Sequence, residues 1–349
     1  MKERITIKDI AELAGVDHST VSRALNNSPR VSAKTKKRIQ DLAGKMNFEF
    51  NAFGRSLRRG KSGNIAVIHS GEWDGFGTSQ YFNLLFSSLR KDLERHMMDA
   101  LILEAYNPDT GESNISRLIR QRKVDGFLLV HSDIKKSDYQ LITDSNLPFV
   151  QLHSRPKYYT LDKLDYFITD NEEGGRIAAK HLITKGCRRI INLTACLNQS
   201  GEFMMRLEGY KKALQEAGIP YDANLVLQTD CSFQSGYQMV YTHQDLFRQS
   251  DGIFAQADIV AFGAMTALKE LGIMPPKDIL IIGFDDTPLC TLTTPGITSV
   301  HQPVEELTEK ACQRIYYLLG HPTDVTHHQQ ELSPRLVERG STQYIKRIR

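Results

Sequence analysis

Hydrogen-bonding side chains crowd the stretch GVDHSTVSRAL, residues 15–25. Its pattern predicts a short helix after a tight turn, with His18, Ser19 and Arg23 on the outer face. An arginine in this position can form a bidentate pair with guanine, and imidazole and hydroxyl groups can bond other base edges. We therefore expect these three residues to read DNA bases. The DNA-binding residues predicted in this segment are His18, Ser19, Thr20, Ser22, Arg23 and Asn26, of which Thr20 and Ser22 are expected to contact phosphates.

Helices must hold that segment in place. The stretch IKDIAELAG predicts a first helix, with Ile7, Ile10, Leu13 and Ala14 on its inner side. Such a helix can present its apolar stripe to the helix that follows the turn. It would then support the outward-facing helix from behind.

The residues between the helices are of types that favour turns and helix caps. Gly15 permits the left-handed backbone of the turn, and Asp17 can cap the second helix, where Val21 and Leu25 face inward. Ser32 can cap a third helix. The inward residues of that third helix are predicted to be Ile39, Leu42, Ala43 and Met46. Three short helices of this kind form a helix-turn-helix unit, whose second helix enters the major groove.

Charge is distributed unevenly along the 349 residues, whose formal net charge is +3. Residues 1–63 contain 14 Lys and Arg against 6 Asp and Glu, a formal charge of +8, and the remainder has a charge of −5. A basic head on a mildly acidic body favours a polyanion as the partner of the head. Taken alone, the composition allows a solvated basic face equally well.

From Asn64 onward, apolar strands alternate with helical stretches, which predicts parallel sheets covered by helices. About 285 residues exceed a comfortable single core, so two α/β lobes are expected. The predicted strands are 65–69, 100–104, 126–130, 148–152, 189–193, 252–255 and 279–284.

Several function classes find no support in the sequence. It has no run of about 18 apolar residues, and its N-terminus lacks the apolar stretch of a signal peptide, so we expect a cytoplasmic protein. The five cysteines are scattered, which argues against a disulfide framework or a zinc site. A nucleophile elbow and a P-loop are also missing from the sequence. We therefore expect neither an enzyme nor a cofactor or metal site.

Taken together, these motifs resemble the LacI/GalR family of transcriptional regulators over essentially the whole chain. The head resembles the family's headpiece in TIKDIAELAGVDHSTVSRALNNSPRVSAKTKKRI. The body follows the family order in TDNEEGGRIAAKHLITKGCRRI, RLEGYKKALQEAGI, FAQADIVAFGAMTALKELGI, ILIIGFDD, PGITSVHQP and LSPRLVERGST.

The resemblance implies an architecture in three parts. An all-α helix-turn-helix headpiece (1–49) is followed by a hinge helix or linker (50–62). The remainder (63–349) is implied to be a two-lobed α/β core like that of periplasmic sugar-binding proteins, with parallel sheets, that binds an effector and dimerises. The dimer would bind a pseudo-palindromic operator.

The stretch NAFGRSL resembles the family's hinge. The resemblance implies that Leu57 wedges into the minor groove, with Arg55 and Arg58 beside it on the DNA. Gly54 stands where the family usually has alanine, which costs about 1 kcal/mol of helix propensity. We expect the hinge helix to depend on DNA for its formation.

The resemblance also implies an effector cleft at the carboxyl ends of the strands. Arg206 matches the family's arginine that hydrogen-bonds sugar hydroxyls or other polar effector groups. Asp285 matches an aspartate that accepts from a ligand hydroxyl, and Asp258 matches an acidic residue at the cleft wall. A role in capping or in a salt bridge stays open for each. An arginine with carboxylates suits a polyol, because hydroxyls both donate and accept.

Further cleft residues are predicted from their places after strands. Trp73 is the only tryptophan and lies in an aromatic segment after the first strand, so it is a candidate to stack on a sugar. Phe233 is a second candidate platform, because Cys231 stands where the family usually has an aromatic residue. The complete predicted effector set is His69, Trp73, Phe82, His153, Arg155, Arg206, Phe233, Asp258, Asp285 and Gln302.

Three hypotheses follow for function. The first is a sugar-responsive transcriptional regulator, most often a repressor of carbohydrate uptake or catabolism. The second has the same architecture but responds to a nucleobase, nucleoside or sugar phosphate, as an inducer or as a corepressor. The third, an enzyme tethered to DNA, lacks any catalytic motif. Because the sequence shows no leucine-heptad helix after the closing motif, we expect a dimer rather than a tetramer.

Overall fold

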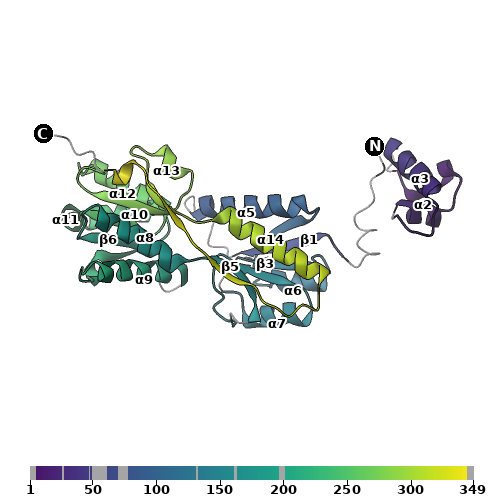
Figure 1. Cartoon of the computed structure of the whole chain (residues 1–349), viewed down its shortest axis with the longest axis horizontal. Helices are drawn as coiled ribbons and strands as arrows, with labels where there is room; N and C mark the ends of the chain where they lie inside the picture. Colours follow the sequence, from purple (N-terminus) through teal and green to yellow (C-terminus); the bar gives the residue numbers. More distant parts are fainter. Residues whose placement is uncertain are drawn as a thin grey trace. The chain divides into compact units, whose positions relative to one another are not determined.

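Two units make up the chain, Met1–Ser62 and Gly63–Arg349 (Figure 1). The structure is a computed structural model. It describes residues 5–25, 27–46, 48, 61–69, 78–130, 133–160, 163–195 and 201–343.

The first unit is a bundle of three helices, α1 (Ile7–Ala14), α2 (His18–Leu25) and α3 (Ala33–Lys45). Its local signals act as predicted. The Ser32 hydroxyl accepts a hydrogen bond from the Thr35 N–H at the start of α3. Fully buried side chains from all three helices meet in the core of the bundle, namely Ile10, Val21, Ala24 and Ile39.

Leu13 corrects one prediction for this unit. Its side chain is 65% exposed, whereas Ile10, Ala11 and Ala14 of the same helix are buried. At 100° per residue, the buried arc of α1 is centred between positions 10 and 11, and Leu13 lies on the other side of Ile10. The apolar stripe is therefore narrower than the sequence suggested.

The first lobe of the second unit is built on a fully parallel six-stranded sheet in the order β11-β5-β4-β3-β1-β2. Helices α5 and α14 cover one face, and α6 and α7 pack with the core on the other. The strands are β1 (Asn64–His69), β2 (Asp99–Glu104), β3 (Gly126–Leu129), β4 (Phe149–Leu152), β5 (Asp165–Thr169) and β11 (Gln329–Leu332). The helices are α5 (Thr78–Arg95), α6 (Asn114–Arg120), α7 (Lys136–Asp144) and α14 (Val304–Gly320).

The second lobe has a six-stranded sheet in the order β12-β10-β9-β8-β6-β7, parallel except for β12. The strands are β6 (Ile190–Ala195), β7 (Val226–Thr229), β8 (Gly252–Ala255), β9 (Leu280–Asp285), β10 (Thr298–His301) and β12 (Arg335–Val337). The helices are α8 (Asn171–Thr184), α9 (Gly201–Glu216), α10 (Phe233–Thr242), α11 (Gln244–Arg248), α12 (Asp258–Glu270) and α13 (Leu289–Leu292), with short 3₁₀ turns at Ala223–Leu225 and Gly340–Thr342.

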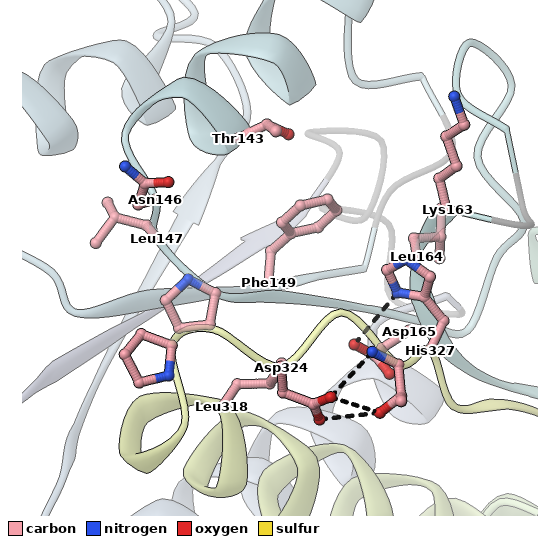
Figure 2. A pocket seen from close by; sticks show the side chains of 13 residues that line it. Thr143, Asn146, Leu147, Phe149, Lys163, Leu164, Asp165, Leu318, Asp324 and His327 are labelled. Atoms are coloured by element: carbon pink, nitrogen blue, oxygen red, sulfur yellow. Dashed lines mark hydrogen bonds and ion pairs between the residues drawn. The ribbon is translucent and has the colours of Figure 1, made fainter.

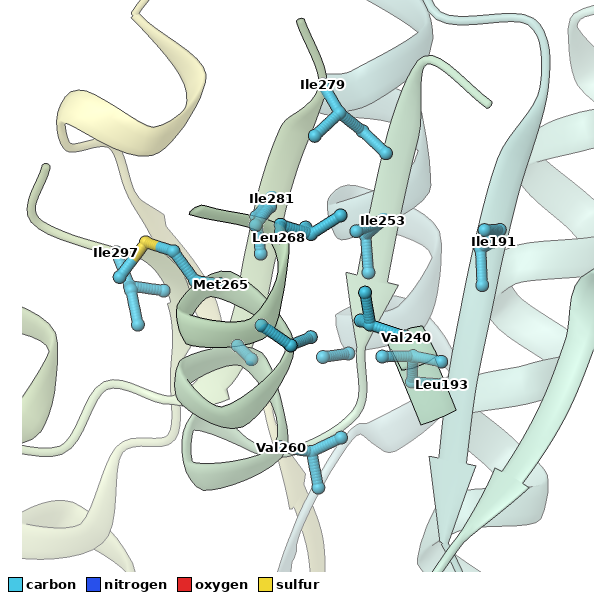
Figure 3. Packing of buried hydrophobic residues seen from close by; sticks show 14 of the residues in the cluster. Ile191, Leu193, Val240, Ile253, Val260, Met265, Leu268, Ile279, Ile281 and Ile297 are labelled. Atoms are coloured by element: carbon cyan, nitrogen blue, oxygen red, sulfur yellow. The ribbon is translucent and has the colours of Figure 1, made fainter. Parts of the chain in front are cut away.

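The core of the second lobe shows why its strands read as apolar runs in the sequence. Figure 3 shows Met265 and Leu268 of α12 beside Ile253 and Ile281, with Ile191 on the neighbouring strand. A second buried cluster lies against α8 and α9 on the other face of the same sheet. Strands that are buried on both faces need apolar residues at consecutive positions, as parallel sheets typically do.

The chain passes between the lobes three times, after β5, after β10 and after β11. Each lobe is therefore assembled from separate stretches of sequence, and the three crossings form the hinge between the lobes. The strand that follows each crossing lies at or near a sheet edge. The described part of the chain contains no helix long and apolar enough to cross a membrane.

Candidate functional site

The turn before α2 is built as the sequence predicts. Gly15 has a left-handed backbone (φ 60°), and Val16 N–H donates to the carbonyl of Ala11. The Asp17 carboxylate accepts from the Ser19 N–H at 2.8 Å and caps α2. On the next helix, Arg38 donates to the carbonyl of Ala14 at 2.8 Å, at the end of α1. These contacts fix the direction in which α2 presents its outer face.

Most of the predicted base-reading residues lie on that outer face. Arg23 and His18 are exposed, and Ser19 and Thr20 are partly exposed. The His18 Nδ1 atom lies 3.4 Å from the carboxylate of Asp17. In this conformation, one exposed helix face therefore carries donors and acceptors that can reach a groove of DNA.

Ser22 does not belong to this face. Its side chain is 4% exposed and lies on the buried arc of α2 beside Val21 and Ala24. The prediction that Ser22 contacts phosphate is therefore wrong for this conformation. Asn26 and the hinge residues Arg55, Leu57 and Arg58 lie outside the described residues.

A second candidate site surrounds Arg206 on α9, in the second lobe. Its side chain is 3% exposed, with Nε donating to the Asn171 side chain at 2.8 Å and Nη1 donating to the carbonyl of Gln256 at 2.6 Å. The guanidinium carbon lies 3.6 Å from the ring centroid of Phe284. Arg206 is thus fixed from three sides, and its Nη2 atom lies 3.9 Å from a carboxylate oxygen of Asp285.

Asp285 ends β9 with an unusual backbone. Its φ is 107°, and that of the next residue, Asp286, is 54°. Two consecutive non-glycine residues with positive φ store strain, which persists only where surrounding contacts enforce it. Burial, helped by the negative charge of Asp258, raises the pKa of Asp285 to about 7.

Gln302 links Asp285 to the hinge between the lobes. Its amide nitrogen donates to Asp285 at 2.7 Å, and its amide oxygen accepts from the hydroxyl of Thr169 at 2.8 Å. Thr169 ends β5 in the first lobe, and Gln302 lies in the crossing after β10. The predicted residue Gln302 therefore joins the Asp285 carboxylate to two interlobe crossings.

Aromatic groups of the first lobe face this cluster. The Tyr81 hydroxyl lies 3.2 Å from Nδ1 of His153, and the Phe82 ring is 5.0 Å from the imidazole. His69 belongs to the same aromatic group, with its ring 5.4 Å from that of Phe86. His153 has a positive φ of 66°.

Electrostatics show that the two lobes meet here. The Tyr81 hydroxyl interacts with the charges of Asp285 and Arg206 in the other lobe, and burial raises its pKa. Burial, with the Arg206 charge adding to it, lowers the pKa of His153 to about 3. The imidazole is therefore neutral at physiological pH. Tyr81 and His153 lie 72 residues apart in the chain, so their pairing emerges only from the fold.

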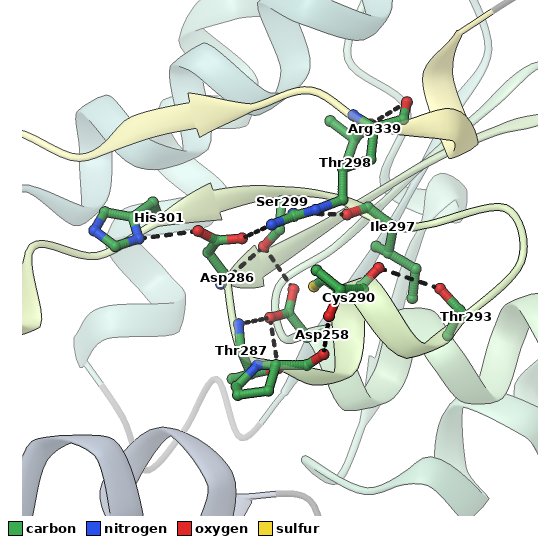
Figure 4. Close-up of polar contacts among 12 residues, drawn as sticks. Asp258, Asp286, Thr287, Cys290, Thr293, Ile297, Thr298, Ser299, His301 and Arg339 are labelled. Atoms are coloured by element: carbon green, nitrogen blue, oxygen red, sulfur yellow. Dashed lines mark hydrogen bonds and ion pairs between the residues drawn. The ribbon is translucent and has the colours of Figure 1, made fainter. Parts of the chain in front are cut away.

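Asp258 occupies a different position from the one predicted. It is 1% exposed and accepts from the Ser299 hydroxyl at 2.6 Å and from the Thr287 N–H at 2.7 Å. The Thr287 hydroxyl is a third donor, at 3.0 Å. Figure 4 shows this carboxylate enclosed by Thr287, Ser299 and the segment that holds Cys290. Because its carboxylate oxygens accept hydrogen bonds from β10 and from the loop after β9, Asp258 holds that loop in place and does not face an effector.

Asp286 anchors the same loop from the other side. Its carboxylate lies 3.0 Å from Nδ1 of His301 and accepts from Arg339 at 2.6 Å, and its N–H donates to the Ser299 hydroxyl (Figure 4). These contacts to β10 and to the segment after β12 supply the restraint that the strained backbone of Asp285 and Asp286 requires.

Two other predicted effector residues are engaged elsewhere. Arg155 forms a salt bridge with Glu331 of β11. The partly buried Phe233 ring packs against Tyr237 and Phe262, at centroid distances of 6.0 and 5.1 Å, beside the core of its lobe. By contrast, the thiol of Cys231 is near enough to interact with the charge of Arg206. Trp73 lies outside the described residues.

A separate cavity of 170 Å³ lies in the first lobe at the amino ends of β4 and β5 (Figure 2). Its wall includes Phe149 and the carboxylates of Asp165 and Asp324. Both carboxylates are paired with the buried Arg314, at 2.8 and 3.1 Å. Since both carboxylates already have a partner, the Arg206 cluster is the stronger candidate for the effector site.

Comparison with known proteins bears on both sites. Residues 6–51 match the model for bacterial regulatory proteins of the lacI family, and residues 179–342 match a periplasmic binding protein-like domain. A probable transcriptional repressor of Bacillus subtilis, ExuR, is 31% identical over 91% of this chain and 92% of its own length. The chain belongs to the LacI family.

Other members are similar over nearly the full length of this LacI-family chain. The ribose operon repressor of Escherichia coli strain K12 is 29% identical over 96% of the chain and 99% of its own length. These relatives are transcriptional repressors, so this member is a DNA-binding regulator rather than an enzyme.

Solved structures agree with the two-part fold. The lac repressor dimer bound to operator and the anti-inducer ONPF superposes with a TM-score of 0.81, at 24% identity over 97% of this chain and 99% of that one. A CelR–cellobiose complex superposes with a TM-score of 0.70, at 26% identity over 97% and 100% of the two chains. The all-α head and the two mostly parallel sheets predicted from the sequence are therefore confirmed.

Proposed function

We propose that this protein represses transcription in the cytoplasm by binding a pseudo-palindromic operator as a homodimer, with an affinity set by a small sugar-like effector. One observation carries the proposal: an exposed helix bearing His18, Ser19 and Arg23 shares a chain with a buried, preorganised Arg206–Asp285 pair. The first group fits base recognition, and the second fits a ligand with hydroxyl groups.

In this proposal, Arg23 donates two hydrogen bonds to guanine in each half-site, which discriminates between bases by about 1–3 kcal/mol. His18 and Ser19 read neighbouring base edges, and Thr20 contacts phosphate. Arg55, Leu57 and Arg58 act in the hinge at the centre of the operator. The domain limits that follow are 1–49 for the head, 50–62 for the hinge and 63–349 for the core.

The effector lies between the lobes, against Arg206 and Asp285 on one side and against Tyr81, His153 and Phe82 on the other. Closure of the lobes around the effector changes the positions of the two hinge segments, residues 50–62 of each chain in the dimer. This in turn changes the affinity for the operator. Such coupling is typically about 1–3 kcal/mol, or about 5- to 150-fold in affinity. The names of two relatives support a sugar, one a ribose operon repressor and one a regulator solved with bound ribose.

A nucleobase or nucleoside is the second candidate effector. The rings of Tyr81, Phe82 and His153 lie within 5.0 to 5.2 Å of one another, and such flat aromatic surfaces also suit a base. A panel of neutral sugars, nucleobases and nucleosides distinguishes the two classes.

The DNA half of the proposal is tested first. An operator selected from random sequence should show two related half-sites. Arg23→Ala should keep the fold and the salt dependence of non-specific binding but lose about 5- to 150-fold in discrimination at one base pair of each half-site. Circular dichroism of the variant provides the folding control. Unchanged operator preference would overturn the role of Arg23.

The effector half is tested with the same operator. Each compound of the panel is added to the wild-type protein, and its effects on thermal stability and on operator affinity are measured. We expect at least one sugar to change both. If no compound in the panel changed operator affinity, the proposed control by a small molecule would be rejected.

A further inference from the structure

The cavity at the amino ends of β4 and β5 is separate from the proposed effector site. His153 follows the carboxyl end of β4 and Thr169 ends β5, and both adjoin the effector site. The cavity lies at the other ends of the same two strands, where its wall includes Phe149 and Asp165. A molecule bound there would therefore not occupy the space between the lobes.

More of the cavity wall is apolar than polar, which is typical of sites that bind small molecules. The cavity has a volume of 170 Å³, and about 150 Å³ is enough to hold a molecule of the size of benzene. Its size therefore fits one six-membered ring with a short substituent. The apolar part of the wall is formed by Leu147, Pro148, Phe149, Leu164, Leu318 and Pro322 (Figure 2).

Arg314 of α14 holds the polar side of the cavity in a fixed shape. Its side chain is buried, with Nε donating to Asp165 at 2.8 Å, Nη1 donating to Asp324 at 3.1 Å and Nη2 donating to the carbonyl of Thr326. It thereby ties α14 to the start of β5 and to the segment that leads into β11. Because these contacts form the cavity in advance, a ligand would pay little to order it.

One carboxylate oxygen of Asp165 is available to a ligand. Asp165 is 4% exposed, and its Oδ1 atom accepts from Arg314 and from the N–H of His328, the latter at 2.6 Å. In the described part of the chain Oδ2 accepts no hydrogen bond, and Nδ1 of His327 lies 4.0 Å from it (Figure 2). That distance is too long for a hydrogen bond. A buried carboxylate oxygen without a donor favours a ligand that supplies one.

The charges around the cavity favour a cationic donor. Asp165 and Asp324 share the guanidinium of Arg314, which balances only one of the two carboxylates. Lys163 is exposed, and in Figure 2 its side chain extends away from Asp165. The His327 side chain is 37% exposed, so it can turn into solvent and leave Oδ2 to a ligand. An anion would meet two carboxylates here, whereas an ammonium group would form a charge-assisted hydrogen bond.

We propose that this cavity is a second ligand site and that it binds a compact apolar amine, with its ring against Phe149 and its ammonium group on Oδ2 of Asp165. This inference goes beyond the proposed function, because it assigns a ligand to a site that the sugar-like effector does not use. The two sites also differ in chemistry. The effector site offers an arginine to hydroxyl groups, and the cavity offers a carboxylate to a cation.

The first test uses three molecules that share a ring and differ in one group. Benzylamine carries a cation, benzyl alcohol a neutral hydroxyl and benzoate an anion. Thermal unfolding of the full chain is followed with each compound at equal ionic strength. Benzylamine at ten times its dissociation constant should raise Tm by about 2–4 °C, benzyl alcohol should raise it less, and benzoate should have no effect. No shift with benzylamine, or an equal shift with either of the others, would overturn the proposal.

Asp165→Asn tests whether this carboxylate receives the amine. The amide keeps an oxygen for Arg314 but loses the negative charge, so benzylamine should bind at least about tenfold more weakly in a calorimetric titration. Asp138→Asn is the matched control. Asp138 is also buried in the first lobe, where it accepts from the hydroxyls of Tyr106 and Ser113, and it does not line the cavity. Wild-type affinity in Asp165→Asn would reject Asp165 as the partner of the amine.

A second pair of variants decides the matter should Asp165→Asn fail to fold. Thr143→Lys and Gln140→Lys each add one positive charge at an exposed position of α7, and of the two only Thr143 lines the cavity. Because like charges repel, benzylamine should bind about tenfold more weakly to Thr143→Lys and with little change to Gln140→Lys. Equal affinities for the two variants would place the bound amine elsewhere and reject the site. Because these assays use neither operator DNA nor a sugar, their results are independent of whether a sugar controls repression.

Discussion

At the residue scale, Asp258 and Asp285 both lie at the carboxyl ends of strands in the second sheet but have different roles. Asp285 points toward Arg206 and Gln302, whereas Asp258 accepts three hydrogen bonds from Ser299 and Thr287. Burial raises the pKa of Asp258 to about 6, and the three hydrogen bonds counteract that rise. The two carboxylates thus divide ligand contact from support of the loop.

Asp258→Ala tests that division. The substitution leaves buried donors of Thr287 and Ser299 without an acceptor, so we expect a loss of about 2–4 kcal/mol in the free energy of unfolding. Asp258→Asn keeps one acceptor and should lose less. Urea unfolding of both variants measures the effect. A loss below about 0.5 kcal/mol for the alanine variant, as at an ordinary surface site, would contradict the supporting role.

At the element scale, the second lobe depends on two close helix pairs. Gly209 of α9 lies against the backbone of α8, where an added Cβ would collide with the carbonyl of Glu172. Gly263 of α12 lies in the same way against the backbone of α10 at Phe233. Because α9 carries Arg206, its distance from α8 also determines where the guanidinium lies relative to Asn171.

Gly209→Ala should therefore separate α8 from α9. We expect a loss of about 3 kcal/mol in the free energy of unfolding, together with weaker effector binding. Gly201→Ala on the same helix is the control, because no atom of the described residues lies within 4 Å of its added Cβ. The control should be neutral or slightly stabilising, by up to about 1 kcal/mol. Equal unfolding midpoints for the two variants would show that the helices can move apart without cost.

At the scale of the whole molecule, the proposed mechanism requires two copies of the chain. A recognition helix reads one half-site, and adjacent half-sites in major grooves lie about one helical turn, 34–36 Å, apart. Because each chain has one head, a pseudo-palindromic operator requires a dimer. Control by an effector requires the hinge segments, residues 50–62 of the two chains, to move together.

We expect a dimer in solution, of twice the chain mass of 39.6 kDa, at micromolar concentration. Light scattering coupled to size exclusion measures the mass, and a titration of operator measures two chains per DNA. DNA with a single half-site serves as the control and should bind more weakly. A stable monomer, or a tetramer, under these conditions would refute the expectation.

Local periodicity and turn chemistry in the sequence determined the helices of the head and most strands of the two sheets. Gly15, Asp17 and Ser32 act within a few residues of where they stand, so their roles in the head could be predicted. The seven strands predicted from apolar runs lie in the two sheets. Short strands such as β7 and β12 were missed, because four or fewer residues of mixed polarity carry little periodic signal.

Only the tertiary structure decided which side chains meet. The pairing of Tyr81 with His153, their position opposite Arg206, and the enclosure of Asp258 all join residues far apart in the chain. The side chain of Ser22 is buried and that of Leu13 is exposed, the reverse of what the sequence predicted. The reason is related, since the buried arc of a short helix is set by its neighbours in the bundle. Sequence spacing fixes the face on which a residue lies, and packing determines whether that face is covered.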